Sequence, residues 1–164
     1  MNKRLAIFLV IGLVIAGIAA ALIFMTHVSS HLEMKGEILK IRADKIDEAN
    51  CVAILDIRLE NVSDVPFTVR MITVTLENAA GEKSEGETLS RKAIPELLNY
   101  NKFLGQLYND TITATDTIKP REKIDRSLVV RFDVPLETFN KARQIRLNLE
   151  DPTGMQFETV KPVK

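Results

Sequence analysis

The chain has 164 residues, of which 22 are basic and 22 acidic, so its formal net charge at pH 7 is zero. This balance provides no positive surface, which excludes nucleic acid and anionic membrane surfaces as electrostatic partners. A single cysteine, Cys51, excludes an internal disulfide, so the fold is expected to be held by packing alone.

An unbroken apolar run, LAIFLVIGLVIAGIAAALIFM, covers residues 5–25. As a helix it would be about 31 Å long, which matches the hydrocarbon core of a bilayer. Residues 1–25 are therefore predicted to be an N-terminal transmembrane signal anchor, with the lipid bilayer as the partner of residues 5–25. The alternative is a signal peptide cleaved after residues 19–21, but the large apolar residues that follow favour retention.

The flanking charges predict the direction of this anchor. Lys3 and Arg4 precede the apolar run, whereas the first basic residue after it is Lys35. Cytoplasmic flanks collect lysine and arginine, so the N-terminus is expected in the cytoplasm and the C-terminal domain on the extracytoplasmic, periplasmic side. Residues 26–36 are interpreted as a juxtamembrane stalk, and residues 37–164 are long enough to form one domain with its own core.

Alternation of apolar and polar residues predominates in this domain. It predicts a half-buried strand over residues 51–59, followed by a turn at Asn61–Pro66 and a second strand over residues 67–78. The apolar phase of the second strand shifts near Met71, where we expect a β-bulge. Residues 79–87 are expected to form a solvated loop, and the other predicted strands cover 37–43, 111–117, 124–134, 145–149 and 155–160, with a tight turn at 151–154.

Apolar residues spaced three and four apart predict one short helix over residues 95–104. Pro95 suits its first turn and Gly105 its end. One or two further helical turns are expected over residues 136–142, with Phe139 pointing inward. About seven strands without βαβ alternation predict a mostly β fold, an immunoglobulin-like antiparallel β-sandwich of two sheets with one short inserted helix.

Two stretches carry a resemblance to a known family: LDIRLENVSDVPFTV at 55–69, and IKPREKIDRSLVVRFDVP at 118–135 followed by IRLNLEDPTG at 145–154. They resemble the telokin-like, immunoglobulin-type domains of unknown function on bacterial membrane-anchored or exported proteins. The resemblance implies an antiparallel β-sandwich outside the cytoplasm and no shared catalytic residues. The chain departs from that pattern at Arg121, where the family usually has glycine, and in the extra helical segment 95–104.

The chain shows no recognisable catalytic or metal-binding constellation. No histidine follows His31, which disfavours hydrolases built on a histidine base. Cys51 falls on the buried face of its strand, where a thiol is usually inert. His27 and His31 could begin a metal site, but no third ligand is evident. We therefore expect no enzyme activity, no metal and no cofactor, and we interpret Asp110 and Asp116 as solvated loop charge.

The segment 95–108, PELLNYNKFLGQLY, contains three aromatic residues: Tyr100, Phe103 and Tyr108. In one interpretation its leucines cap an open end of the sandwich. In the other, the aromatic side chains point outward and bind a partner, since aromatic residues favour interfaces. The functional hypothesis is a membrane-anchored protein-interaction or envelope-complex module that binds an unidentified envelope protein. The alternative is a binder of a small apolar ligand or lipid, held between the sheets or beneath the helix.

Overall fold

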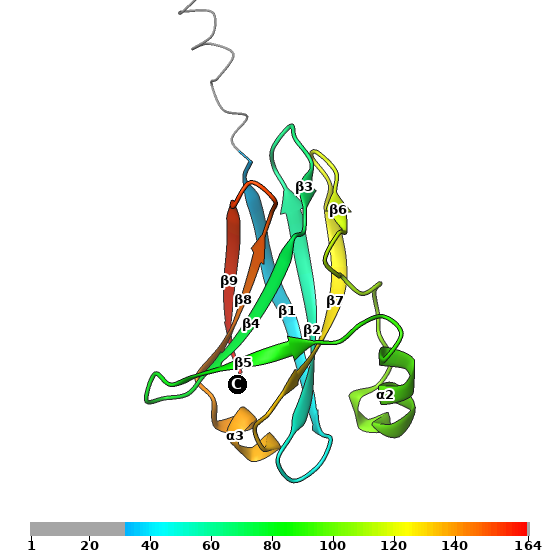
Figure 1. Ribbon diagram of the computed structural model, residues 1–164, viewed down its shortest axis with the longest axis vertical. Helices are drawn as coiled ribbons and strands as arrows, with labels where there is room; N and C mark the ends of the chain where they lie inside the picture. The colour runs from blue at the N-terminus through cyan, green and yellow to red at the C-terminus, as the bar shows by residue number, and fades with distance from the viewer. Residues whose placement is uncertain (1–31, 164) are drawn as a thin grey trace, which may run out of the picture. The chain divides into compact units, whose positions relative to one another are not determined.

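The computed structural model describes residues 32–163 of the protein (Figure 1). The described residues form one compact unit that begins at Leu32, so strand β1 starts within the predicted stalk. The predicted anchor at residues 1–25, and with it His27 and His31, lies outside the described residues. In the range 32–163, no helix has the length and apolar character needed to cross a membrane.

Within residues 32–163, nine strands and three short helical segments follow one another. They are β1 (Met34–Lys45), β2 (Cys51–Asn61), β3 (Phe67–Thr68), β4 (Met71–Glu77), β5 (Lys83–Thr88), α2 (Ile94–Tyr100), the 3₁₀ turn η1 (Lys102–Leu104), β6 (Thr117–Ile118), β7 (Lys123–Phe132), α3 (Leu136–Lys141), β8 (Gln144–Glu150) and β9 (Gln156–Pro162). The expectation of a mostly β, antiparallel fold with few helices is confirmed.

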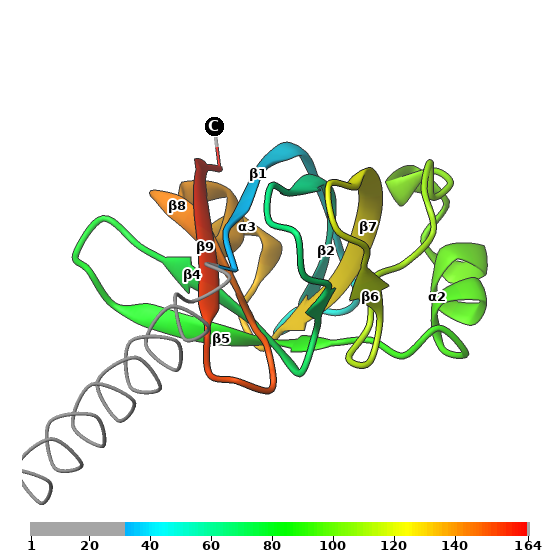
Figure 2. The same ribbon diagram turned by 90° about the horizontal axis from the view of Figure 1, so that it is seen from above.

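Seven strands belong to one antiparallel sheet, in the order β1-β2-β7-β5-β4-β8-β9, and β3 and β6 form a separate two-stranded ladder. The sheet folds over on itself, so that β1, β2 and β7 face β4, β8 and β9 (Figure 2). At the open side β1 comes close to β9. A Cβ atom added to Gly36 of β1 would lie only 3.0 Å from the ring of Phe157 in β9. The result is a sandwich that nearly closes into a barrel, and the prediction of two separate sheets is wrong.

Strand β5 connects the two layers. Its first residues, Lys83–Gly86, pair with β4, and its last two, Glu87 and Thr88, pair with β7. At the crossing point the strand passes very close to β7, where a Cβ on Gly86 would collide with Cγ1 of Val130. The prediction of a loop over residues 79–87 is therefore wrong from Lys83 onward. The sequence did not indicate a strand there, because these residues are polar or small and show no apolar alternation.

The main core lies between the two layers and contains residues from every long strand. The inward face of β2 supplies Cys51, Ala53, Leu55, Ile57 and Leu59, as the alternation predicts. The first seven residues of β2 are all buried, however, so the expectation of a half-buried strand is wrong. The outward residues of this strand are covered by the helical segment that starts at Ile94.

The shift of apolar phase near Met71 is not a bulge. The chain instead forms two strands, β3 and β4, which pair with different partners: β3 with β6, and β4 with β5 and β8. The predicted strand at 111–117 is also mostly irregular and contributes an isolated bridge at Thr111 and the start of β6. By contrast, the β8–β9 hairpin and the inward position of Phe139 in α3 are confirmed.

The turn that carries the family resemblance is held by Asn61. Its amide donates to the carbonyl of Val65 at 2.8 Å, and its side-chain oxygen accepts the Ser63 N–H at 3.0 Å. Arg121 lies against this turn and donates from Nε to Asp64 Oδ1 at 2.9 Å. Its φ of 60° is the left-handed conformation that glycine adopts without strain, and glycine is the residue expected at this position from the resemblance.

Candidate functional site

Residues 94–108, called the insert below, form a small helical layer on the outer face of β2 and β7. Pro95 lies in the first turn of α2, the η1 turn follows, and Gly105 ends it with a φ of 72°. The predicted helix at 95–104 is thus confirmed as two shorter pieces. Ile94 and Leu104 pack with the outward side chains of the strands beneath them in a second buried cluster: Val52, Ile54 and Val129.

This cluster corrects the interpretation that the leucines cap an open end of the sandwich. Leu97 and Leu98 pack at the margin of the second cluster, on the outer face of the sheet rather than at its end. The insert therefore buries the outward residues of β2, which explains why both faces of that strand are buried. Burial of apolar surface on both sides fixes the insert to the sheet.

Arg42 of β1 fastens the far end of the insert. Its Nη1 donates to the carbonyl oxygens of Leu104 at 2.6 Å and Gln106 at 2.9 Å. Its Nη2 lies 3.2 Å from Asp56 Oδ2, and Asp56 also accepts the Ser127 hydroxyl at 2.8 Å. These donors satisfy two carbonyl groups at the end of η1, so the loop after the helix is held in a single position.

The three predicted partner-binding aromatics are all exposed: Tyr100 by 84%, Phe103 by 93% and Tyr108 by 60%. Their outward orientation is confirmed, and their binding to a partner stays a prediction. Tyr108 also contacts a side chain of the domain itself: the Arg42 guanidinium lies 4.7 Å from its ring centroid. This distance is within the range of a cation–π contact, so Tyr108 is also part of the attachment of the insert.

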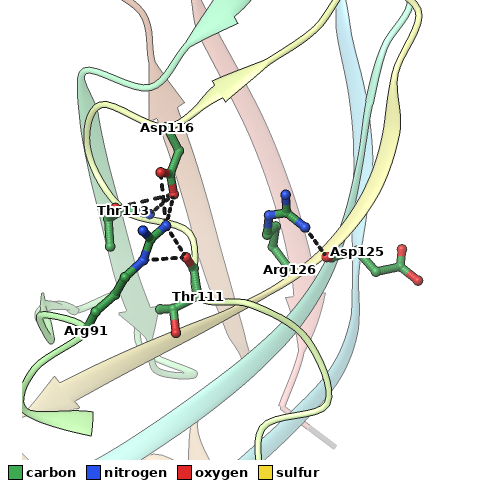
Figure 3. Close-up of polar contacts among 6 residues, drawn as sticks. All are labelled: Arg91, Thr111, Thr113, Asp116, Asp125 and Arg126. Atoms are coloured by element: carbon green, nitrogen blue, oxygen red, sulfur yellow. Dashed lines mark hydrogen bonds and ion pairs between the residues drawn. The ribbon is translucent and has the colours of Figure 1, made fainter.

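Beside Tyr108 lies a hollow of about 900 Å³ with mostly polar walls, called the polar hollow below. Figure 3 shows its central ion pair, in which Arg91 Nη2 lies 2.7 Å from Asp116 Oδ2. The same guanidinium donates to the Thr111 carbonyl at 2.9 Å, and Asp116 also accepts the Thr113 N–H at 2.8 Å. The interpretation of Asp116 as solvated loop charge is therefore wrong: it organises the irregular segment 111–116.

The opposite wall of the polar hollow carries Asp125 and Arg126. Arg126 Nη1 donates to the carbonyl of Asp125 at 3.1 Å (Figure 3). The Asp125 carboxylate accepts two hydrogen bonds from Arg58, at 2.8 and 2.9 Å, and this bonding holds the pKa of Asp125 below its usual range. The acidic groups around Arg91 and Arg58 are thus paired, and their charges are largely neutralised locally.

The described residues offer little for covalent or metal chemistry. Cys51 is fully buried in the main core, and burial raises the pKa of its thiol to about 11, so the reactive thiolate is suppressed. Within residues 32–163, no three side chains of histidine, cysteine, aspartate or glutamate are grouped so that they could hold a metal ion.

Sequence reasoning missed a shallow apolar groove beside α2, with a volume of about 580 Å³. Its walls combine residues far apart in the chain, including Ile46 of the β1–β2 turn, Leu89 after β5, and Leu97 and Tyr100 of the helix. No local pattern links these positions, because the groove forms only when the insert packs on the sheet. Tyr100 therefore lies at the edge of an apolar depression.

No protein-family model and no curated protein matches the sequence significantly. Among solved structures, the chain is similar to an uncharacterised β-sandwich protein from Clostridium difficile, with 12% identity over 81% of this chain and 87% of that one and a TM-score of 0.41. It is similar to an ApaG protein from Pseudomonas aeruginosa, with 12% identity over 73% and 96% and a TM-score of 0.38. A third is the archaellum periplasmic stator protein FlaG from Sulfolobus acidocaldarius, with 14% identity over 79% and 98% and a TM-score of 0.37. At such low scores these likenesses assign no family, activity or partner.

Proposed function

We propose that the protein is a single-pass membrane protein that displays a telokin-like, immunoglobulin-type sandwich outside the cytoplasm. Residues 5–25 remain in the bilayer, the N-terminus stays in the cytoplasm, and the domain from Leu32 onward lies in the periplasm. There it acts by binding, without catalysis, as a protein-interaction or envelope-complex module. The length of the apolar run and the Lys3–Arg4 flank support the membrane placement.

The observation that carries this proposal is the exposure of Phe103 and Tyr100 on a segment that is otherwise fixed. Phe103 is 93% exposed, whereas its neighbour Leu104 is 2% exposed and belongs to the second cluster. An apolar side chain that is exposed to this extent buries little surface in the domain, so it adds little to the domain's stability. Rigid aromatic side chains lose little conformational entropy on binding, and they dominate the energetics of protein interfaces.

Photo-crosslinking in intact cells tests this function. The full chain carries a photoreactive residue at position 103 or, as the matched control, at position 160 of β9, where Val160 is also exposed. We expect a discrete crosslinked protein from position 103 that is absent from position 160. In a separate affinity purification without crosslinking, the double variant Tyr100→Ala with Phe103→Ala should no longer retain the protein identified in this way. Unchanged capture would remove the insert from the interface.

The membrane placement has a separate test. A reporter that is active only outside the cytoplasm, fused after Lys164, should be active in cells, and the mature chain should keep its N-terminal residues. A reporter that works only in the cytosol would contradict the orientation. A shortened, membrane-free product would contradict retention of the anchor.

The apolar groove beside α2 favours one alternative function, the binding of a small apolar ligand or lipid. The position beneath the helix is filled by Ile94 and Leu104, so a ligand would lie in the groove, against Leu89 and Leu97. Native mass spectrometry of the purified full chain tests this alternative. A bound lipid that is lost in Leu97→Arg would support it, and a ligand-free spectrum would count against it.

A further inference from the structure

Strand β4 has different neighbours along its two edges. On one edge, β8 pairs with all seven residues, Met71–Glu77, whereas on the other edge β5 pairs only with Val74–Glu77. Beyond this point β5 turns away toward α2 (Figure 1). Successive residues of a strand direct their backbone groups to opposite edges, so Met71 and Thr73 face β8 and Ile72 faces the other side, where it has no backbone partner among the described residues. The sheet therefore has a short free edge on its surface.

The gap next to this edge is a hollow of about 610 Å³, called the basic slot below. One side is Arg70–Ile72, the opposite side is the segment Thr88–Lys92, and the floor includes Ile112 and Ala114. The volume lies in the range of roughly 300–1,000 Å³ that is usual for ligand sites. Met71 is 48% exposed there, which leaves an apolar side chain at the free edge without cover.

The charged side chains of the basic slot all have the same sign. Arg70, Arg91 and Lys92 line it, and no carboxylate does. Arg91 is paired with Asp116, and Arg70 lies 3.6 Å from Glu150, but Lys92 has no ion-pair partner among the described residues. The slot is therefore complementary to a negatively charged occupant.

An extended peptide meets all of these features at once. A strand added here would pair with Ile72, whose N–H and C=O provide two hydrogen bonds, and would run beside Met71–Thr73 for about 10 Å, at about 3.3 Å per residue. In such strand addition the main-chain hydrogen bonds supply affinity, and alternate side chains supply specificity. A small anion would leave Met71 and the strand edge unused, and a neutral apolar ligand would leave Lys92 without a partner.

We propose that the basic slot binds an extended acidic segment of a partner protein, which adds as a strand to β4 at the free backbone groups of Ile72. The inference rests on the proposed function only in taking the occupant to be a protein. Alternate side chains of the segment pack on Met71, and the intervening carboxylates face Arg70 and Lys92. The slot is distinct from the surface formed by Tyr100 and Phe103.

The test uses the full chain in neutral phosphatidylcholine nanodiscs and a fluorescent eight-residue peptide of alternating valine and glutamate. The control peptides are a valine–lysine version, for charge, and a version with alternate backbone nitrogens methylated, which keeps charge but cannot complete the ladder. Fluorescence anisotropy measures binding, and hydrogen exchange of the Ile72 amide locates it. We expect each control peptide to bind at least about tenfold more weakly.

The variant Lys92→Glu with Arg70→Glu should invert the preference, so that the lysine peptide binds better than the glutamate peptide. Both positions are on the surface, so the fold is expected to persist. Equal binding of the glutamate and lysine peptides, equal binding of the methylated peptide, or no protection of the Ile72 amide would each overturn the inference. The Tyr100→Ala and Phe103→Ala variant should bind the glutamate peptide normally, which separates this result from failure of the proposed function.

Discussion

Arg42 and Asp56 form an ion pair between β1 and β2, with Nη2 3.2 Å from Oδ2. The pair is buried, since the two side chains are only 12% and 7% exposed. Each partner has a second role: Arg42 holds the insert through two carbonyl groups, and Asp56 accepts the hydroxyl of Ser127. One ion pair therefore links the sandwich to the surface on which the exposed aromatics lie.

Removal of one partner should be costly. The variant Asp56→Ala leaves the Arg42 guanidinium buried without its counter-charge, and the free energy of unfolding should fall by about 3–5 kcal/mol. Urea denaturation of the full chain in detergent, followed by circular dichroism, measures this loss. The control is Asp125→Ala, which breaks an ion pair about a third exposed and should cost about 1 kcal/mol or less. Equal losses in the two variants would contradict the importance of burial.

Two neighbouring residues of the insert should separate stability from binding. Leu104→Ala removes a buried side chain from the second cluster and should lower the free energy of unfolding by about 2–5 kcal/mol. Phe103→Ala, at an exposed position, should change it by less than about 0.5 kcal/mol. The same urea experiment compares them. A large loss in Phe103→Ala would show that this side chain packs within the domain and is not free for a partner.

The main core could be predicted because its signal is local. The alternation of Cys51, Ala53 and Leu55 places one face of β2 inward, and the Asp151–Gly154 turn fixes the β8–β9 hairpin. The spacing of the leucines left two interpretations of the insert open, and the exposure of Tyr100 and Phe103 agrees with one of them. The burial of the second face of β2 does not follow from local spacing, because it depends on a segment about 40 residues later in the chain.

Three other features could not be read from the sequence for a related reason. Strand β5 has the sequence KSEGET, in which close approach to β7 requires a small residue at Gly86 instead of apolar side chains. The change of partner between β3 and β4 resembles a bulge when only the apolar phase is visible. The basic slot exists because β4 and β5 diverge, which no pattern within either strand specifies.

The left-handed conformation of Arg121 gives a test of the turn against which it packs. Arg121→Ala and Arg121→Gly both lose the ion pair with Asp64, but only glycine adopts a φ of 60° without strain. The glycine variant should therefore be more stable than the alanine variant by about 1 kcal/mol. Thermal unfolding of the two variants measures the difference. A more stable alanine variant would mean that position 121 does not hold this conformation.

Acid should destabilise the domain through specific carboxylates. Hydrogen bonds from Arg58 lower the pKa of Asp125, and a hydrogen bond from Arg121 lowers the pKa of Asp64. A pKa that is lower in the folded state gives stability that is present above the unfolded value, near pH 4, and is lost as the pH falls through the folded value. The free energy of unfolding should thus be steady between about pH 5 and 7 and fall below about pH 4.

The variant Asp125→Asn tests the contribution of one of these carboxylates. It should be less stable than the parent chain at pH 7, where the Asp125 carboxylate is ionised and bonded to Arg58. The difference should shrink as the pH falls below about 4, because the parent then loses the same charge. Urea midpoints at a series of pH values measure both curves. A constant difference down to the lowest pH would exclude the titration of Asp125 as the cause.

Burial of Cys51 should make its thiol a reporter of global unfolding. The residue has no exposed surface, and burial raises its pKa to about 11, so at pH 8 roughly one molecule in a thousand carries the thiolate. A thiol reagent such as dithiobis-nitrobenzoate should react with Cys51 only where urea unfolds the chain, in parallel with the loss of circular dichroism. Thr153→Cys, in the exposed β8–β9 turn, provides the control that reacts in the folded protein. Rapid reaction of Cys51 in the absence of urea would mean that β2 separates from its neighbours locally, because both of its edges are paired and both of its faces are covered in the folded domain.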